Sequence, residues 1–318
     1  MTEQRPLIFV GGTGRSGTHV VASMLDRHSR FHSIPIECRF HTNPKGFPDL
    51  LAGRVSKQGF LDKLRNFWWR RIRAGEPFPA LLPGLPLGRQ TRGLFKILER
   101  QAFDDAAARF ESAYDSDPEA ACRALLLELL MPLADDAGKP GLVEMSCFTV
   151  ARAATLARLF PEAKLIHSVR DGRDAGSSKV AKRQKREHPR DARQGVEWWL
   201  GRLAEAEAGA QAIPADRLLT ISLDELVGDD REASYARILD FLEIADEPPI
   251  REFFESEMTP ENAHRGRWSD GLGEAEREQV VAAYEQALER IEADGYLSAP
   301  LLRRVYERER SGSGVAPA

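Results

Sequence analysis

The stretch GGTGRSGTHVV at positions 11–21 places glycines, hydroxyl side chains and one arginine directly after a short apolar run. Such a turn between a strand and a helix often binds phosphate, because the unpaired backbone amides of the helix start point at the anion. Counted from Gly12, the spacing is G-x-G-x-x-G, typical of dinucleotide binding, and also G-x-x-x-x-G-T, typical of a nucleoside-triphosphate loop. The stretch therefore predicts phosphate chemistry and leaves the kind of phosphate open.

The dinucleotide interpretation makes the protein an NAD(P)-dependent oxidoreductase. It is favoured by Glu37, which follows the last of these glycines by 20 residues, where an acidic residue would bind a ribose hydroxyl. Two features oppose it. Arg15 and His19 put polar and cationic groups at the helix start, where a dinucleotide fold needs close packing of helix on strand. In addition, Pro35 weakens the expected second strand.

The triphosphate interpretation lacks one part of the usual machinery. Arg15 and Thr18 are present, but Gly17 occupies the position of the lysine that reaches the outer phosphates. Since a glycine cannot supply that charge, the loop suits a 5′-phosphate better than magnesium-triphosphate chemistry.

The composition limits the class of protein. The chain has 318 residues, 42% of them hydrophobic, and a formal net charge of −4, which argues against a nucleic-acid partner. Its three cysteines, Cys38, Cys122 and Cys147, are too few and too irregularly spaced for a disulfide framework or a zinc site, so we expect no metal. The most apolar segment, 124–134, is too short for a transmembrane segment. Because the chain starts without a signal sequence, we expect a cytoplasmic protein.

Short apolar runs alternate with amphipathic segments along most of the chain. We predict strands at 7–10, 142–144, 164–169 and 218–221. We predict helices at 18–27, 150–160, 195–212, 231–242 and 274–291. This alternation is typical of a three-layer α/β fold, in which helices cover both faces of a central parallel sheet and ligands bind beyond the carboxyl ends of the strands.

The strand pattern lapses over residues 45–140, which we interpret as a mostly helical inserted region that caps the sheet. Helical patterns near 60–71, 94–111 and 119–133 surround a proline-rich stretch at 77–86. The aromatic and basic segment FWWRRIR at 67–73 either contacts an acceptor or a membrane surface, or forms an amphipathic helix with buried tryptophans. We predict one domain over 1–310 and a flexible tail over 311–318.

The residues Ile8 to Thr18 resemble the 5′-phosphosulfate-binding loop of the sulfotransferases that use 3′-phosphoadenosine 5′-phosphosulfate (PAPS). The similarity is closest to bacterial and tyrosylprotein-sulfotransferase-like members, with Gly14 in place of a proline and His19 in place of a second threonine. The resemblance implies a P-loop-like fold whose first turn binds the 5′-phosphate of the donor. The implied 5′ site comprises Thr13, Gly14, Arg15, Ser16, Gly17, Thr18 and His19.

A second stretch, 165–178, resembles the family's 3′-phosphate site. Arg170 follows a predicted strand and Ser178 lies on the next helix, and together they would grip the 3′-phosphate by charge and by a directional donor. Lys182, one helical turn further, would rim the same cleft. The alternative is an exposed turn with Arg170 and Asp174 as a surface ion pair.

A third stretch, 261–268, resembles the loop that closes over the 3′-phosphate. It would contribute Arg265, Gly266 and Arg267 to the donor site. The alternative is a helix-entry loop that Trp268 anchors in the core.

Sulfuryl transfer needs a base for the acceptor hydroxyl and positive charge on the leaving side. The sequence Glu37-Cys38-Arg39 resembles the family's E-x-R element, which implies Glu37 as the general base and Arg39 as an acceptor-binding residue, with Arg15 as the catalytic cation. His41 is the second candidate base and would also contact the acceptor. The alternative is a Glu37–Arg39 ion pair with a structural role.

Two positions depart from the family pattern. Met145 stands where relatives often carry a lysine that assists the departing phosphate, so either Arg15 acts alone or Lys179 or Lys182 substitutes. Leu223 stands where an aromatic residue often lies beside adenine.

The resemblance implies a sulfotransferase that moves a sulfuryl group from PAPS to an acceptor hydroxyl by in-line displacement, with 3′,5′-adenosine bisphosphate (PAP) as product and no metal. The acceptor is left open among a small molecule, a sugar, a lipid and a peptide tyrosine. The oligomeric state, a homodimer included, is also left open. Because of the two departures, a non-catalytic nucleotide-binding protein remains an alternative beside the oxidoreductase.

Overall fold

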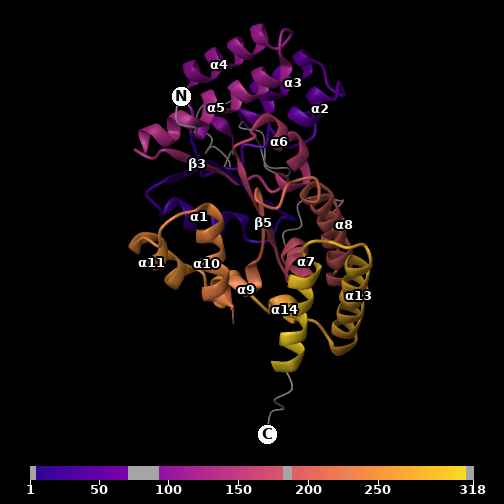
Figure 1. The fold of residues 1–318 in the computed structure, drawn as a ribbon. Coiled ribbons are helices and arrows are strands. Elements are labelled where there is room, and N and C mark those ends of the chain that lie inside the picture. The colour runs from indigo at the N-terminus through magenta and orange to yellow at the C-terminus, as the bar shows by residue number, and fades with distance from the viewer. Residues whose placement is uncertain (1–4, 71–92, 182–187, 229, 313–318) are drawn as a thin grey trace, which may run out of the picture.

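In the part of the chain that the structure describes, five short strands form one parallel sheet at the centre of the molecule (Figure 1). The computed structural model describes residues 5–70, 93–181, 188–228 and 230–312. The strands are β1 (Leu7–Gly12), β2 (Phe31–Ser33), β3 (Gly141–Glu144), β4 (Lys164–Val169) and β5 (Leu218–Ser222). Their order is β2-β3-β1-β4-β5, and every neighbouring pair is parallel. The predicted α/β fold with a central parallel sheet is confirmed, and β2, which was not among the predicted strands, ends before Pro35.

Side chains of β1 alternate between the two faces of the sheet, because successive residues of a strand point in opposite directions. Leu7 and Phe9 belong to the core on one face, and Ile8 and Val10 to the core on the other. All residues of β1 are buried, which explains why the strand appears in the sequence as a continuous apolar run.

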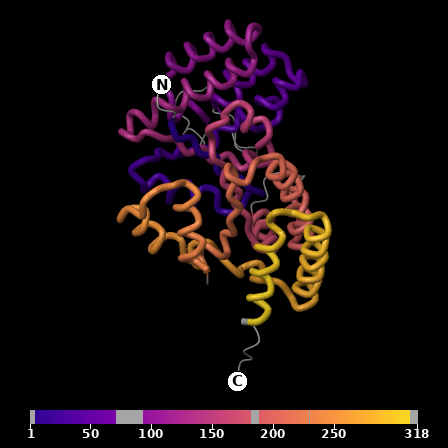
Figure 2. The backbone as a smooth tube through the Cα atoms, in the orientation of Figure 1, coloured from indigo at the N-terminus to yellow at the C-terminus, as the bar shows by residue number. Residues whose placement is uncertain are grey.

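Helices cover both faces, as the ribbon and the backbone tube show (Figures 1 and 2). The face of Leu7 packs against α4, α5 and α6, and the face of Ile8 packs against α1, α10 and α11. The helical elements are α1 (Thr18–Asp26), α2 (Phe47–Leu51), α3 (Lys57–Lys63), η1 (Leu64–Trp68), η2 (Leu94–Lys96), α4 (Arg100–Ala113), α5 (Pro118–Asp136), η3 (Val150–Arg152), α6 (Ala153–Leu159), α7 (Gly172–Ala181), α8 (Ala192–Ala210), α9 (Leu223–Val227), α10 (Arg231–Leu242), α11 (Pro248–Glu257), α12 (Pro260–Ala263), η4 (Arg267–Ser269), α13 (Glu274–Ala293) and α14 (Ala299–Gly312).

The described part of the inserted region is helical, running from α2 to α5, and it shares one apolar core with the sheet. Trp68 and Trp69 are only 1% and 8% exposed, and the Trp69 ring lies 4.5 Å from that of Phe103. The tryptophans therefore belong to the core, as the amphipathic-helix alternative states, while Phe67 is 45% exposed. The proline-rich stretch at 77–86 lies outside the described residues.

The carboxyl-terminal part forms two further helices, α13 and α14, that pack against α8. Helix α14 is not among the predicted helices, and the expected tail starts too early, because Ser311 and Gly312 still belong to this helix. Residues 313–318 lie outside the described part. Of the helices described, none is long and apolar enough to cross a membrane.

Candidate active site

The turn from β1 into α1 has a backbone that depends on glycine. Gly14 and Gly17 have φ angles of 78° and 82°, in the left-handed region where residues with a Cβ are strained. A Cβ on Gly12 would lie 2.2 Å from the carbonyl oxygen of Ser168 on β4. Arg15 adopts a φ of 64° despite its side chain, a conformation that is common at functional sites.

The same turn presents polar groups without protein partners. Helix α1 has no side-chain cap on its first turn, which leaves the backbone amides there open to an anion. The Ser16 hydroxyl is fully buried and finds no hydrogen-bond partner among the described residues. Because buried polar atoms are nearly always hydrogen-bonded, this atom indicates a ligand-binding turn. Thr13 and Thr18 are buried beside it.

Arg170 ties the end of β4 to two loops. Its Nη2 donates to the carbonyl oxygens of Ala263 and His264, both at 2.8 Å, and its Nη1 donates to the carbonyl oxygen of Arg15 at 3.4 Å. Its Nε has no partner within the described part of the chain. The ion pair with Asp174 exists at 3.5 Å, but both side chains are buried, so the surface-pair alternative is wrong about its setting.

The residues predicted to bind the 5′-phosphate and those predicted to bind the 3′-phosphate lie next to each other. Arg15 Nε donates to Ser178 Oγ of α7 at 2.9 Å. Burial lowers the pKa of Arg15 below its usual value, and the nearby Arg170 cation lowers it further. An anion bound between the two guanidinium groups would relieve this repulsion. The structure therefore brings Arg15, Arg170 and Ser178 together at the carboxyl ends of two adjacent strands.

The loop at 265–267, predicted to contribute three residues to the donor site, has those residues in different surroundings. The backbone amide of Gly266 donates to Asp174 Oδ2 at 2.7 Å, and Arg265 lies against Gly228, where a Cβ would come within 2.3 Å of Arg265 Nη1. Arg267 instead bonds Asp270 at the surface, with its side chain 64% exposed. The three loop residues thus differ in their access to the Arg170 site.

Trp268 is half-buried, with the Arg173 guanidinium 4.9 Å from its ring. Trp268 also packs against the core formed by α8, α13 and α14, as the helix-entry alternative expects. Lys182 lies outside the described residues.

Glu37 follows β2 and lies in a charged cluster. Its carboxylate forms an ion pair with Arg39 and a hydrogen bond with Cys147, and His19 contributes its charge from the start of α1. Burial alone would raise the pKa of Glu37, but Arg39, Cys147 and His19 together lower it below its usual value. Glu37 is therefore ionised at neutral pH and able to accept a proton. Arg39 has a φ of 65°, a second strained residue beside the first turn.

His41 lies in a different environment from the one we expected. Its side chain is fully buried, and Nε2 lies 2.9 Å from Glu144 Oε2 on β3. Glu144 also accepts hydrogen bonds from the backbone amides of Cys38 and Ser146. His41 thus anchors the turn that carries Glu37 and is out of reach of an acceptor at the surface.

The sequence names Asp174 as a partner of Arg170, but it does not point to Asp224, a further carboxylate near Arg170. The Asp171 amide donates to Asp224 Oδ2 at 2.7 Å. Burial, then the nearby Asp171 charge, raises the pKa of Asp224 to about 7. Asp171 and Asp174 stand in the same stretch of sequence as Arg170, whereas the proximity of Asp224 appears only in three dimensions.

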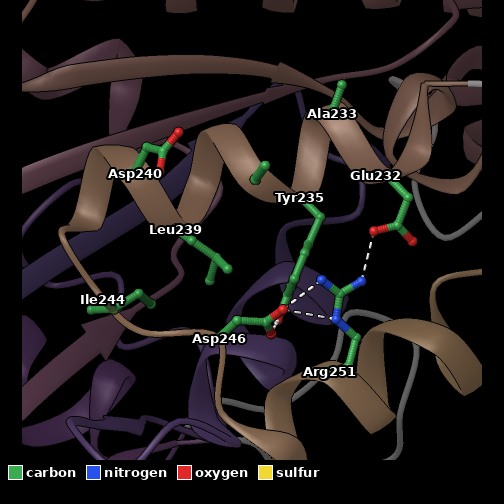
Figure 3. A pocket seen from close by; sticks show the side chains of 9 residues that line it. Glu232, Ala233, Tyr235, Leu239, Asp240, Ile244, Asp246 and Arg251 are labelled. Atoms are coloured by element: carbon green, nitrogen blue, oxygen red, sulfur yellow. Dashed lines mark hydrogen bonds and ion pairs between the residues drawn. The ribbon is translucent and has the colours of Figure 1, made fainter.

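A pocket of about 570 Å³ lies between α10 and the start of α11 (Figure 3). Its lining includes three carboxylates, Glu232, Asp240 and Asp246, and one guanidinium, Arg251. Arg251 pairs with Glu232 and Asp246. Because its acidic groups repel a phosphosulfate, this pocket is unsuited to a sulfuryl donor.

Comparison with known proteins places this site in a family. Residues 6–248 match the model of the sulfotransferase family. The chain belongs to the sulfotransferase family. The match includes the first turn, Glu37, Arg170 and Ser178, and it ends before the loop at 265–267.

Two curated relatives show the extent of the similarity. The chain is 28% identical to mouse protein-tyrosine sulfotransferase 1 over 178 residues, which cover 56% of this chain and 35% of the mouse protein. It is 26% identical to chicken protein-tyrosine sulfotransferase 2 over 182 residues, covering 57% and 36%. The chain therefore spans about a third of the length of these relatives.

A sulfotransferase from Alicyclobacillus acidocaldarius is a structural neighbour of this family member. It aligns with a TM-score of 0.47 and 15% identity over 92% of this chain and 96% of its own.

The two residues of this chain that depart from the family pattern are both buried. Met145 is 3% exposed and lies in the core on the Ile8 face. Leu223 is 2% exposed and packs against the first turn, where a Cβ on Gly17 would lie 2.8 Å from its methyl groups. Met145 therefore brings no charge to the site, and Leu223 supports the turn from below.

Proposed function

We propose that this chain transfers a sulfuryl group from PAPS to an acceptor hydroxyl. The observation that carries the proposal is the junction of two cationic grips, Arg15 with Ser178 and Arg170 with the Arg15 carbonyl. Two adjacent anion sites suit a nucleotide with phosphates at both the 3′ and the 5′ position. Family membership supports sulfuryl transfer as the reaction.

The described residues fit such a donor. The buried Ser16 hydroxyl and the Arg170 Nε both lack a hydrogen-bond partner among the described residues, and each is a donor that a phosphate oxygen can satisfy. The amides of the first turn add further donors for the 5′-phosphate. In this proposal Arg170, Ser178 and Arg265 would hold the 3′-phosphate.

Glu37 acts as the general base in this proposal. Its carboxylate takes the proton of the acceptor hydroxyl while the acceptor oxygen forms a bond to sulfur. The bond between sulfur and the bridging phosphate oxygen breaks, and its electron pair stays on the phosphate, which leaves as part of PAP. Arg15 stabilises the negative charge that develops on that phosphate. Glu37 then returns its proton to solvent.

The proposal is tested by replacing Glu37 with glutamine, which keeps the size of the side chain and removes the base. Conversion of PAPS to PAP in the presence of phenol acceptors should fall by about 1,000-fold, because general bases contribute about 10²–10⁴-fold. The affinity for PAP should stay unchanged. Glu128→Gln is the matched control, since Glu128 pairs with Arg109 at the surface of α5.

Two results would contradict the proposal. Full turnover in Glu37→Gln would remove Glu37 as the base. An absence of any PAPS conversion by the wild-type protein, together with binding of NAD that depends on Glu37, would support the oxidoreductase instead.

A further inference from the structure

A single arginine is a weak provision for the charge that sulfuryl transfer develops. The leaving phosphate gains a negative charge, and preorganised cations stabilise such a charge most effectively. Arg15 is one cation, and its Nε is engaged by Ser178. Met145, where a lysine would be expected, is enclosed by apolar neighbours and has no room for a charge. Because Arg170 is assigned to the 3′-phosphate in the proposed function, a second cation for the leaving phosphate would come from another element.

Lys179 lies next to Ser178 on α7, and its ammonium is held against an aromatic ring. Lys179 Nζ lies 5.1 Å from the ring centroid of Trp198 on α8. The same ring lies near the first turn, since a Cβ on Gly14 would lie 4.0 Å from Trp198 Cη2. Trp198 is therefore close both to the Lys179 ammonium and to the turn that would bind the 5′-phosphosulfate.

A close helix crossing fixes this arrangement. Gly176 of α7 and Gly195 of α8 are in direct backbone contact, since a Cβ on Gly176 would lie 2.5 Å from the Gly195 carbonyl carbon. Lys179 and Trp198 each come three residues after one of these glycines and so lie on the same helix face, one turn on. The contact between the glycines thus brings the ammonium and the indole together beside the first turn.

We propose that Lys179 is the second catalytic cation and that Trp198 is its positioning residue. This inference rests on the proposed function. Lys179 donates a hydrogen bond to the leaving phosphate as the bond between sulfur and the bridging oxygen breaks, and it keeps its proton throughout. Trp198 holds the Lys179 ammonium over its ring by cation–π attraction.

The test compares Lys179→Met with a matched control, Lys164→Met. Lys164 also places its ammonium over a ring, 5.3 Å from the centroid of Phe241, but at the opposite end of β4 from the site. Conversion of PAPS to PAP is followed with phenols as acceptors and with water alone, so that no particular acceptor is required. Affinities for PAP and for 3′-AMP, which lacks the 5′-phosphate, are measured by calorimetry.

We expect Lys179→Met to lower kcat about 100-fold, in the range seen when one transition-state donor is removed. Its affinity for 3′-AMP should match the wild type, because Arg170 and Ser178 remain. Lys179→Arg should recover about a tenth of the wild-type kcat or more, since the charge is restored. Trp198→Leu should lower kcat about tenfold, and Trp198→Phe should recover most of it, because a ring face is retained.

The outcomes separate this inference from the proposed function. If the wild type binds PAP and converts PAPS while Lys179→Met keeps its kcat within about twofold, the inference is overturned and the proposed function stands. If Lys164→Met loses as much turnover as Lys179→Met, the effect is one of stability, and the inference is likewise overturned. A wild type that neither binds PAP nor converts PAPS contradicts the proposed function, and the inference with it.

Discussion

The turn after β1 and the turn after β4 lie side by side at the carboxyl end of the sheet, yet they are built by different means. The first depends on backbone shape, with Gly14 and Gly17 in the left-handed region and Gly12 pressed against β4. The second depends on charge, with Arg170 surrounded by Asp174 and neighbouring carboxylates. The first should therefore fail for steric reasons and the second for electrostatic ones, which pH and charge substitutions can separate.

The largest expected effect is at Gly12. Gly12→Val places a Cβ 2.2 Å from the Ser168 carbonyl oxygen, so β1 and β4 must move apart. We expect a loss of about 3 kcal/mol or more in the free energy of unfolding, which is the upper range for overpacking. Urea unfolding measures this loss, and a Gly12→Val protein as stable as the wild type would contradict the account of the first turn.

Gly14→Ala is the matched control in the same turn. The space around Gly14 is open except for Trp198 at 4.0 Å, so the cost arises only from its φ of 78°. A loss of about 1 kcal/mol is expected, the usual cost of a Cβ in the left-handed region.

The second turn should respond to pH. The pKa of Asp224 is raised from 3.8 to about 7 by burial, and then by the Asp171 charge. A carboxyl group whose pKa is raised by folding keeps its proton in the folded state at a pH where the unfolded chain has lost it. Its contribution to the free energy of unfolding therefore falls as pH rises from about 4 to about 7. Asp224→Asn retains an oxygen for the Asp171 amide and removes this loss.

We expect the stability of Asp224→Asn relative to the wild type to increase as pH rises from 5 to 8, by an amount of the order of 2 kcal/mol. Urea unfolding of both proteins across this range measures the difference. Gly14→Ala keeps Asp224 and has a conformational cost, so its stability should differ from that of the wild type by the same amount at every pH in this range. Parallel pH profiles for Asp224→Asn and the wild type would contradict the charge-based account of the second turn.

A smaller effect on PAP binding should distinguish the two arginines of the loop at 265–267. Arg265 lies against Gly228 and follows His264, whose carbonyl oxygen accepts a hydrogen bond from Arg170, whereas Arg267 bonds Asp270 at the surface. Arg265→Ala should weaken PAP binding about tenfold, as expected for a hydrogen bond to a charged group. Arg267→Ala should leave it within about twofold, in keeping with exposed ion pairs. Equal losses in calorimetric titrations would show that Arg267 also reaches the ligand.

The smallest effect is at Cys147. Its thiol, whose pKa burial raises to about 12 with a further contribution from Glu37, stays protonated and can donate to the Glu37 carboxylate. Cys147→Ala should therefore raise the pKa of Glu37 by less than about one unit, since Arg39 remains. The acidic limb of kcat/KM against pH should move upward by the same amount. An unchanged limb would mean that the thiol bond has no influence on the base.

The sequence predicts the sheet well, because buried parallel strands appear as short apolar runs. It also predicts Arg15, Arg170 and Ser178 as neighbours, since residues that follow adjacent parallel strands meet at one edge. The three-residue strand β2 escapes prediction because it is too short to show a pattern. Helix α14 escapes because its polar residues resemble those of a tail.

The side-chain environments were harder to predict. In the sequence, His41 has the features of an acid–base residue. In the structure it is buried and paired with Glu144, which lies more than 100 positions away in the sequence. The contact of Asp224 with the Asp171 amide likewise comes from a separate element, helix α9, which follows β5. Such contacts depend on packing of separate elements, which local spacing does not encode.

The most direct measurement is calorimetric titration of the purified protein with PAP and with NAD, without added metal. The account predicts binding of PAP and none of NAD. Arg170→Ala should weaken PAP binding about 100-fold, because it removes a charged grip on one phosphate. Arg109→Ala, at the surface pair of α4, should bind PAP like the wild type. Preference for NAD, or PAP binding that is unaffected by Arg170→Ala, would contradict a site built for a nucleotide with 3′- and 5′-phosphates.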